Sequence, residues 1–332
     1  MVTQREVAKQ ARVSVATVSR YINKKGYISP EIQNRILEAI EQLHYKPNLI
    51  ARSLKLRSTK TLGHIFPDIE NEFFIRLIRM AEDIAHKHGY TVILCNTENK
   101  VEKEKIYIDV LKGKLVDGYI IIPAVSQEGN QYEILSNENV VYVDRFANVD
   151  KEICIKLDNK KGVRLGLEYL IGLGHRRIGI VNVPQNVTTG YDRYEGYRET
   201  LLERGIEFDE TLVAFADYSV EGSLQETVGL LQSVRPPTAI FPMSGPTTAG
   251  ALLAIKQLGL KIPQDISIIG FDELEYAELL NPPLTVIVQP AYEFGRIATE
   301  TLLKIINKKR IGPKLIELEP TLKIRGSCAR IS

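Results

Sequence analysis

From residue 60 onward, short apolar runs alternate with longer segments whose apolar residues recur every three or four positions. The short runs predict strands and the longer segments predict helices. Strands are expected at residues 62–69, 92–96, 118–123, 140–144, 154–157, 178–183, 239–243, 266–271 and 285–289. Helices are expected at residues 73–88, 101–115, 162–173, 193–203, 220–231, 247–258 and 292–307. This alternation is typical of doubly wound parallel sheets, and it is too long for one sheet, so we expect two α/β lobes that divide near Asp158.

The first 58 residues follow a different pattern, with three short stretches of helical spacing. Thr3 and Glu6 have the spacing of a capping box, which predicts the start of a first helix. After a tight turn, Ser14 is placed to cap a second helix at residues 15–22. Ser29, as a cap, and Pro30, at the first helical position, predict the start of a third helix. Two short helices joined by a turn and supported by a third predict an all-α helix-turn-helix domain.

Charge is distributed unevenly between these two parts. Residues 1–58 contain 11 Lys and Arg against 4 Asp and Glu, whereas the whole chain contains 43 against 41. The remainder, residues 59–332, is therefore acidic, with 32 basic against 37 acidic residues. A basic N-terminal part indicates a polyanion partner, although charge alone leaves open a merely solvated basic terminus.

Composition and motifs exclude several other classes of protein. Apolar runs such as residues 120–122 are far shorter than the roughly 18 residues of a membrane span, and no secretory signal begins the chain, so we expect a cytoplasmic protein without membrane contact. Cys95, Cys154 and Cys328 are odd in number and far apart, which favours free thiols. No dinucleotide or phosphate-loop motif and no metal-ligand cluster is present, so we expect neither an enzyme nor a bound cofactor or metal.

The N-terminal part resembles the LacI/GalR (lactose-repressor) family of bacterial transcription regulators. The resemblance is carried by Val7-Ala8, residues 13–20, Asn23 and residues 45–54. Arg12 departs from it, because the family often has glycine in this turn, and a positive φ would strain an arginine.

The resemblance implies that the second helix enters the major groove of DNA. The residues expected to face bases are Val15, Ala16 and Arg20, since arginine pairs with guanine and small apolar groups contact the thymine methyl. The short polar side chains suited to phosphate oxygens are Thr3, Ser14, Thr17, Ser19 and Asn23. The alternative for Val15 is that it packs inside the domain.

Residues 47–56 resemble the hinge helix of the family, which folds when paired with its twin on operator DNA. Asn48 is placed to cap this helix, and Ala51 matches the small residue that lets the two hinge helices approach. Leu54 matches the leucine that the family inserts into a minor-groove step to kink the duplex. The alternative is a plain linker.

For residues 59–332 the resemblance implies a periplasmic-binding-protein-like body of two lobes with an effector and dimerisation role. We expect the first lobe at about residues 59–158 and 289–318 and the second at about 159–288 and 319–332. The chain would then cross between lobes near Asp158, Gln289 and Glu319. Ligands of such folds bind where the carboxyl ends of the strands meet. The candidate effector-binding residues there are Asp68, Asn71, Phe73, Phe74, Asn96, Arg145, Arg193, Tyr218, Ser244, Asp272 and Gln289.

These residues also have structural alternatives. Asp68 and Asn71 are suited to capping the following helix, one of the two phenylalanines is expected in the core, and Arg193 is suited to an ion pair with Asp272. Ser244 and the glycine after it stand where the family often has asparagine and an acid. We therefore expect an effector that is a sugar, a sugar acid or a sugar phosphate, and the retained Arg145 and Arg193 favour the two anionic classes over a standard hexose.

The sequence therefore predicts a homodimeric repressor of carbohydrate-utilisation genes that binds a pseudo-palindromic operator in double-stranded DNA. A small effector in the cleft between the lobes would control it by allostery. Two alternatives remain open at this point: a global catabolite regulator with a phosphorylated protein as corepressor, and a sugar-binding protein without a DNA function.

Overall fold

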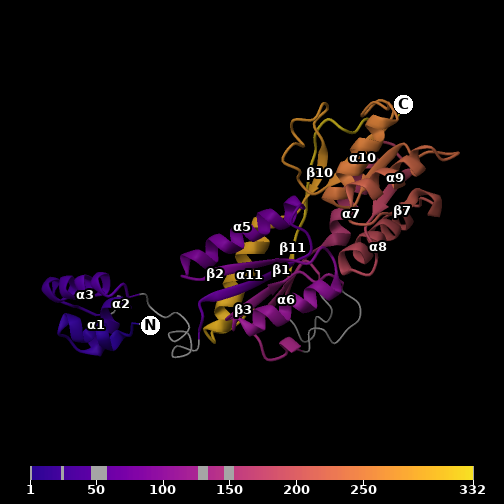
Figure 1. Ribbon diagram of the computed structural model, residues 1–332. Helices are drawn as coiled ribbons and strands as arrows, with labels where there is room; N and C mark the ends of the chain where they lie inside the picture. Colours follow the sequence, from indigo (N-terminus) through magenta and orange to yellow (C-terminus); the bar gives the residue numbers. More distant parts are fainter. Residues whose placement is uncertain (1, 24–25, 46–57, 126–133, 146–152, 332) are drawn as a thin grey trace. The chain divides into compact units, whose positions relative to one another are not determined.

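The computed structural model describes residues 2–23, 26–45, 58–125, 134–145 and 153–331 (Figure 1). The chain forms two compact units, Met1–Thr59 and Lys60–Ser332. In the described part, no helix is both long enough and apolar enough to span a membrane. The cysteines are free thiols, with Cys95 and Cys154 buried and Cys328 half-buried, as their spacing predicts.

The N-terminal unit contains the three predicted helices, which are α1 (Gln4–Ala11), α2 (Val15–Ile22) and α3 (Pro30–Gln42). The capping box is present: the Glu6 amide donates to Thr3 Oγ1, and the Thr3 amide donates to Glu6 Oε2 at 2.7 Å. The side chains that form the core of this unit are Val7, Ala8, Ala11, Val18, Ile36, Ala39 and Tyr45. The prediction that Ser29 caps the third helix is wrong for its side chain, which makes no capping hydrogen bond, although Pro30 does stand in the first turn.

The larger unit contains two six-stranded sheets. The first has the order β11-β5-β4-β3-β1-β2 and is parallel throughout. Its strands are β1 (Thr61–Phe66), β2 (Thr91–Asn96), β3 (Gly118–Ile121), β4 (Val140–Val143), β5 (Cys154–Leu157) and β11 (Leu315–Leu318). The second has the order β12-β10-β9-β8-β6-β7, with β12 antiparallel to β10. Its strands are β6 (Ile178–Asn182), β7 (Val213–Phe215), β8 (Ala239–Pro242), β9 (Ser267–Phe271), β10 (Thr285–Val288) and β12 (Thr321–Lys323).

Helices cover both sheets (Figure 1). They are α5 (Glu72–Lys87), α6 (Val101–Gly113) and α11 (Ala291–Ile306) with the first sheet, and α7 (Asn159–Gly172), α8 (Thr188–Glu203), α9 (Val220–Leu231) and α10 (Gly245–Gln257) with the second. Helices α5 and α11 approach so closely that a Cβ at Gly295 would lie 2.2 Å from the carbonyl oxygen of Leu77, which only glycine avoids. A short 3-10 helix, Glu210–Leu212, precedes β7.

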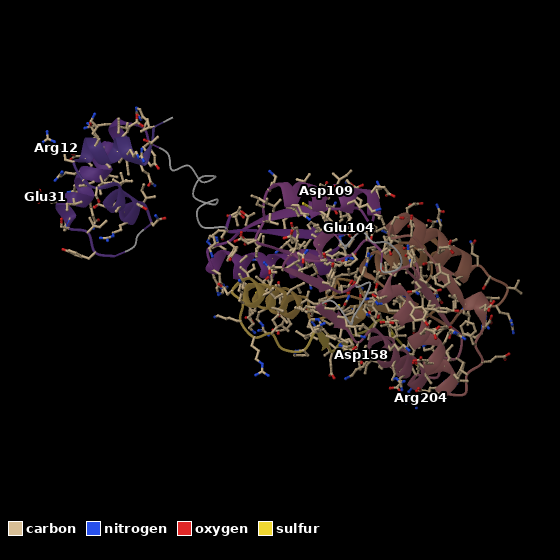
Figure 2. All side chains as sticks on the ribbon, turned by 90° about the horizontal axis from the view of Figure 1, so that it is seen from below. Arg12, Glu31, Glu104, Asp109, Asp158 and Arg204 are labelled. Carbon is tan, nitrogen blue, oxygen red and sulfur yellow. The ribbon has the colours of Figure 1, made fainter. Side chains whose placement is uncertain are left out.

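The chain passes from one sheet to the other three times, at residue 158, at residues 289–290 and at residues 319–320. Asp158 stands at the first passage and caps α7 by accepting from the Lys161 amide at 2.9 Å (Figure 2). Each passage leads out of the carboxyl end of a strand of one sheet. The connections therefore keep the carboxyl ends of both sets of strands close to one another.

The boundaries differ from the predicted ones in several places. The first strand ends at Phe66 rather than at residue 69, since Asp68 and Asn71 turn the chain into α5. Helix α8 begins at Thr188, five residues before the predicted start, so Arg193 lies in its second turn. The strands β7, β11 and β12 were not predicted.

Candidate functional site

Helix α2 presents the predicted base-contacting residues to solvent. Val15 is 41% exposed, and Ala16 and Arg20, one helical turn apart, are exposed as well. Val18 is fully buried and forms the inward face of the helix. The alternative in which Val15 packs inside the unit is therefore wrong.

Three of the predicted phosphate-contacting residues, Thr3, Ser14 and Asn23, stand at cap positions and make local hydrogen bonds there. Ser14 Oγ accepts from the Thr17 amide at 3.1 Å and lies 2.8 Å from Thr17 Oγ1. Asn23 Nδ2 donates to the carbonyl oxygen of Ser19 at 2.7 Å. Thr3 Oγ1 donates to a carboxylate of its capping box. These side chains are exposed or half-buried, so their groups remain within reach of an external partner.

The turn between α1 and α2 has the positive φ considered for Arg12, together with a contact from α3 that the sequence did not predict. Arg12 adopts the left-handed conformation, with φ 49°, and its side chain lies at the periphery of the unit (Figure 2). Arg35, from α3, donates through Nη2 to the carbonyl oxygens of Ala11 (2.5 Å) and Arg12 (2.9 Å). The Arg35 guanidinium therefore holds the turn that precedes α2. The predicted hinge residues Asn48, Ala51 and Leu54 lie outside the described residues.

In the larger unit, a small cavity lies where segments that follow strands of both sheets meet. Its volume is about 30 Å³, which exceeds the ~10–15 Å³ that one ordered water needs. The residues that line it are Asp68, Asn71, Phe73, Phe74, Asn99, Asp144, Arg145, Val183, Thr189, Arg193, Tyr218, Ser244, Pro246, Asp272 and Gln289. A small ligand there would touch both lobes at once.

The first lobe contributes two polar side chains and two aromatic rings after β1. Asp68 Oδ1 accepts from the Glu70 amide at 2.8 Å, and Asn71 Oδ1 caps α5 by accepting from the Phe73 amide at 3.0 Å. These residues therefore both shape the turn and line the cavity. Phe73 and Phe74 are both buried, with ring centroids 5.3 Å apart, so each belongs to the core and to the lining.

An acidic and a basic residue follow β4 and are both buried. Asp144 has φ 64°, and its Oδ2 lies 3.8 Å from Arg145 Nε. Arg145 Nη1 donates to Asn99 Oδ1 at 2.8 Å, and the guanidinium carbon lies 5.0 Å from the centre of the Tyr218 ring in the second lobe. Burial raises the pKa of the Asp144 carboxyl, and the charge of Arg145 opposes this shift.

Arg193 enters the cavity from the second turn of α8. Its Nε donates to Asn159 Oδ1 at 2.7 Å, its Nη1 donates to the carbonyl oxygen of Met243, and its guanidinium lies 3.9 Å from the centre of the Phe271 ring. Burial lowers the pKa of Arg193, and the carboxylates of Asp272 and Asp144 oppose this shift. Arg193 and Asp272 both lie in the described part of the chain, and no ion pair joins them, so the structure does not contain the ion pair given above as the alternative for Arg193.

Asp272 is held by two donors at the end of β9. It has φ 77°, Oδ1 accepts from Gln289 Nε2 at 2.6 Å, and Oδ2 accepts from the Gly245 amide at 2.9 Å. Ser244 forms a capping box with Thr247 at the start of α10. The backbone N–H at position 245, which any residue except proline would supply, therefore helps to fix the carboxylate.

In the part of the chain that the structure describes, four buried polar atoms of the lining have no hydrogen-bond partner: Asp144 Oδ1, Arg145 Nε, the Tyr218 hydroxyl and Gln289 Oε1. Buried polar groups in folded proteins are nearly always paired, so such a group needs a partner from outside the chain. Two of the four accept, one donates and the hydroxyl does both. A ligand that both donates and accepts hydrogen bonds at several points complements this set.

The structure does not bring Asn96 into the lining. Its place is taken by Asn99, which a turn with positive φ at Glu98 (54°) and Asn99 (56°) directs to Arg145. Thr189 was also missed, because the early start of α8 was not predicted. Within the described ranges, no group of three or more His, Cys, Asp and Glu side chains could hold a metal ion.

Comparison with known proteins identifies the family. Residues 3–48 match the bacterial regulatory proteins of the lacI family, and residues 167–328 match the periplasmic binding protein-like domain. The chain is 39% identical over 325 residues to the ribose operon repressor of Halalkalibacterium halodurans. The aligned region covers 98% of this chain and 96% of that protein. The chain belongs to the LacI family. It is also 36% identical to the transcriptional repressor PurR of Edwardsiella ictaluri, over 99% of this chain and 97% of that one.

Solved structures of transcription regulators are similar to this chain over nearly its whole length. A lac repressor dimer bound to operator and an anti-inducer has a TM-score of 0.86 and 25% identity, with 99% of each chain covered. A complex of the regulator CelR with cellobiose has a TM-score of 0.74 and 28% identity, with 98% of this chain and 100% of that one covered. The predicted family and fold class, and the role as a DNA-binding transcription regulator with a small-molecule effector, are therefore confirmed. LacI-family repressors act on operator DNA as dimers.

Proposed function

We propose that the protein represses a carbohydrate-utilisation operon and that a small polyhydroxylated effector in the lobe cavity controls it. The observation that carries the proposal is the set of four polar atoms of the cavity lining, from both lobes, that have no partner among the described residues. A relative named ribose operon repressor and a structural neighbour in complex with cellobiose support a carbohydrate. Because the relatives are named as repressors, we infer that the cavity binds this ligand without converting it.

The balance of charge in the lining changes the expected chemistry of the effector. Two guanidiniums, of Arg145 and Arg193, stand beside three carboxylates, of Asp68, Asp144 and Asp272. A cavity with more acids than bases does not favour an anion, so the lining supports a neutral sugar over the predicted sugar acid or phosphate. Hydroxyl groups both donate and accept, which suits the unpartnered atoms, and the Tyr218 ring offers a face for the C–H side of a sugar.

A ligand screen by thermal shift tests this proposal. The panel contains D-ribose, other neutral pentoses and hexoses, sugar acids, and sugar phosphates such as D-ribose 5-phosphate. A neutral sugar at 100 times its Kd is expected to stabilise the protein by about 2.7 kcal/mol. Stabilisation by the anionic members alone would contradict a neutral effector, and no stabilisation by any member would contradict the carbohydrate class. Repeating the screen with operator present gives the sign of the coupling.

We further propose the residues that read the operator. Val15, Ala16 and Arg20 would face bases from α2, and the flanking polar side chains of residues 3, 14, 17, 19 and 23 would contact phosphates. Residues 47–56 would form the hinge helix, with Leu54 as the inserted side chain. Exposure of Val15 and Arg20 supports this assignment.

Arg20→Ala is expected to weaken operator binding by about 1–3 kcal/mol and to relax the preference at one base position per half-site. The measurement is selection from a randomised dyad-symmetric library with wild type and variant in parallel. Arg5→Ala, which removes an exposed positive charge from α1, is the matched control and should weaken binding evenly across sequences. An unchanged base preference in Arg20→Ala would contradict the assignment.

We propose the domain limits as residues 1–58 for DNA binding and 59–332 for the body, with lobes of residues 59–158 and 289–318 and of 159–288 and 319–332. The three passages between the sheets support these limits. We place the protein with its DNA in the bacterial cytoplasm, which rests on its membership of a DNA-binding family.

A further inference from the structure

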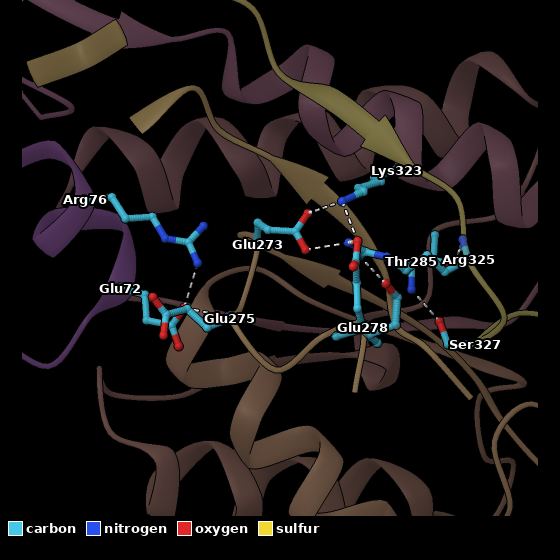
Figure 3. A network of polar contacts seen from close by, with 10 residues as sticks. Glu72, Arg76, Glu273, Glu275, Glu278, Thr285, Lys323, Arg325 and Ser327 are labelled. Carbon is cyan, nitrogen blue, oxygen red and sulfur yellow. Dashed lines mark hydrogen bonds and ion pairs between the residues drawn. The ribbon is translucent and has the colours of Figure 1, made fainter. Parts of the chain in front are cut away.

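Among the described residues, polar contacts join the lobes at two places away from the three chain passages. One lies inside the cavity, where Arg145 of the first lobe stands 5.0 Å from the centre of the Tyr218 ring of the second. The other lies outside the lining: Glu72, in the first turn of α5, accepts through Oε2 the amide N–H of Glu275 in the second lobe at 2.8 Å (Figure 3). Only the first contact lies where a ligand would bind, so the second can persist when the cavity is filled.

The Glu72 carboxylate is fixed on its own side. Arg76, one helical turn later, donates to the same Oε2 at 3.2 Å, and the Glu72 side chain is 26% exposed. The neighbours of Glu72 in sequence, Asn71 and Phe73, both line the cavity. A contact of Glu72 with the opposite lobe therefore acts directly on the cavity wall.

The segment that carries Glu275 is also fixed, because ion pairs hold it to Lys323 in β12 and to Arg325 just after that strand. Glu273 accepts from Arg325 Nη2 at 2.6 Å, and Glu278 accepts from Lys323 Nζ at 2.8 Å (Figure 3). Arg325 Nη1 donates in addition to the carbonyl oxygen of Leu284 at 2.7 Å. The Glu275 amide, which donates the hydrogen bond between the lobes, therefore lies in a loop that is fixed to the rest of the second lobe. This loop is expected to move together with that lobe.

We propose that Glu72 is a latch between the lobes, whose carboxylate holds the second-lobe loop and keeps the cavity closed without a ligand. A hydrogen bond to a charged acceptor is stronger than a neutral one, so the latch needs the carboxylate rather than any acceptor. By raising the fraction of closed molecules, it raises the apparent affinity for a ligand that binds the closed form. This last consequence rests on the proposed effector site, whereas the latch itself does not.

Hydrogen exchange of the full-length protein, followed by mass spectrometry without ligand or DNA, tests the latch. In Glu72→Ala, peptides over residues 272–280 and over residues 216–220, around Tyr218, are expected to exchange about tenfold faster than in wild type. Glu72→Gln keeps an acceptor without the charge and should give an intermediate rate. Because no ligand is present, the result does not depend on the identity of the effector.

A matched variant serves as the control. Glu70→Ala removes an exposed carboxylate from the same turn and leaves the pairing of Glu72 with Arg76 and Glu275 in place, so it should exchange as wild type does. Faster exchange over residues 216–220 in Glu72→Ala alone supports the latch. Unchanged exchange, acceleration confined to residues 272–280, or equal acceleration in Glu70→Ala would overturn it.

Discussion

The buried His64 should make the stability of the body depend on pH. His64 lies in the middle of β1 and is 2% exposed, and neither of its ring nitrogens has a hydrogen-bond partner among the described residues. Leu62 and Phe66, two positions away on the same face of the strand, belong to the core beneath α5. Burial in these surroundings lowers the pKa of His64 from 6.5 to about 3.

The size and sign of the effect follow from proton binding. Between pH 3 and 6.5 the unfolded chain binds a proton on this imidazole and the folded chain does not, so stability falls as the pH falls below about 6.5. The loss is about 1.4 kcal/mol per pH unit, or about 2 kcal/mol between pH 6.5 and 5. For a folded unit of this size, that corresponds to a decrease in Tm of roughly 5 °C. Above pH 7 the contribution is fully present.

Calorimetry of wild type and His64→Leu between pH 8 and 5, at one protein concentration, measures this contribution. Leucine fills a similar volume and does not titrate, so the Tm of the variant should decrease by about 5 °C less than that of wild type. His86→Gln removes an exposed histidine of α5 and should follow wild type. Parallel Tm curves for wild type and His64→Leu would refute a neutral buried imidazole.

Three further predictions concern single contacts. Tyr218→Phe removes a hydroxyl that has no partner among the described residues, so the Tm should stay the same. The affinity for the effector found by screening, measured by calorimetry, should fall about tenfold. An unchanged affinity would count against a ligand contact. Arg35→Met leaves the carbonyl oxygen of Ala11 without its donor. In a binding titration it should weaken operator binding evenly across sequences. A change of base preference would contradict the role of Arg35 in holding the turn before α2. Gly295→Ala forces a Cβ against the Leu77 carbonyl and should lower the free energy of unfolding of the body in urea by more than about 2 kcal/mol. An unchanged free energy of unfolding would show that α5 and α11 separate easily.

The sequence predicted the fold where burial is complete. Strands such as β3 and β9 are buried at every position, so they read as uninterrupted apolar runs. Three of the four edge strands, β7, β11 and β12, were missed for the opposite reason. Strand β11 alternates exposed and half-buried residues over four positions, and β7 and β12 contain only three residues each, so neither length nor periodicity separates them from loops.

The candidate site was predictable to the extent that it follows from strand ends. Parallel strands bring the residues after them to one edge, which is why Asp68, Arg145 and Asp272 could be expected together. Asn99 was missed because two successive residues with positive φ, which no local pattern announces, direct it to Arg145. The contact of Arg35 with the turn after α1 joins residues more than 20 positions apart, and only the packing of α3 reveals it.

Two carboxylates of the cavity lining belong to residues with an uncommon backbone conformation. Asp144 directly follows β4 in the first lobe, and Asp272 directly follows β9 in the second; both are 5% exposed and have positive φ, 64° and 77°. This conformation costs a residue with a side chain roughly 1–2 kcal/mol and would cost glycine little. A chain selected only for stability would favour glycine at both strand ends. Each lobe instead carries a buried aspartate at the equivalent point, one beside Arg145 and one held by Gln289, and we propose that these carboxylates serve the ligand.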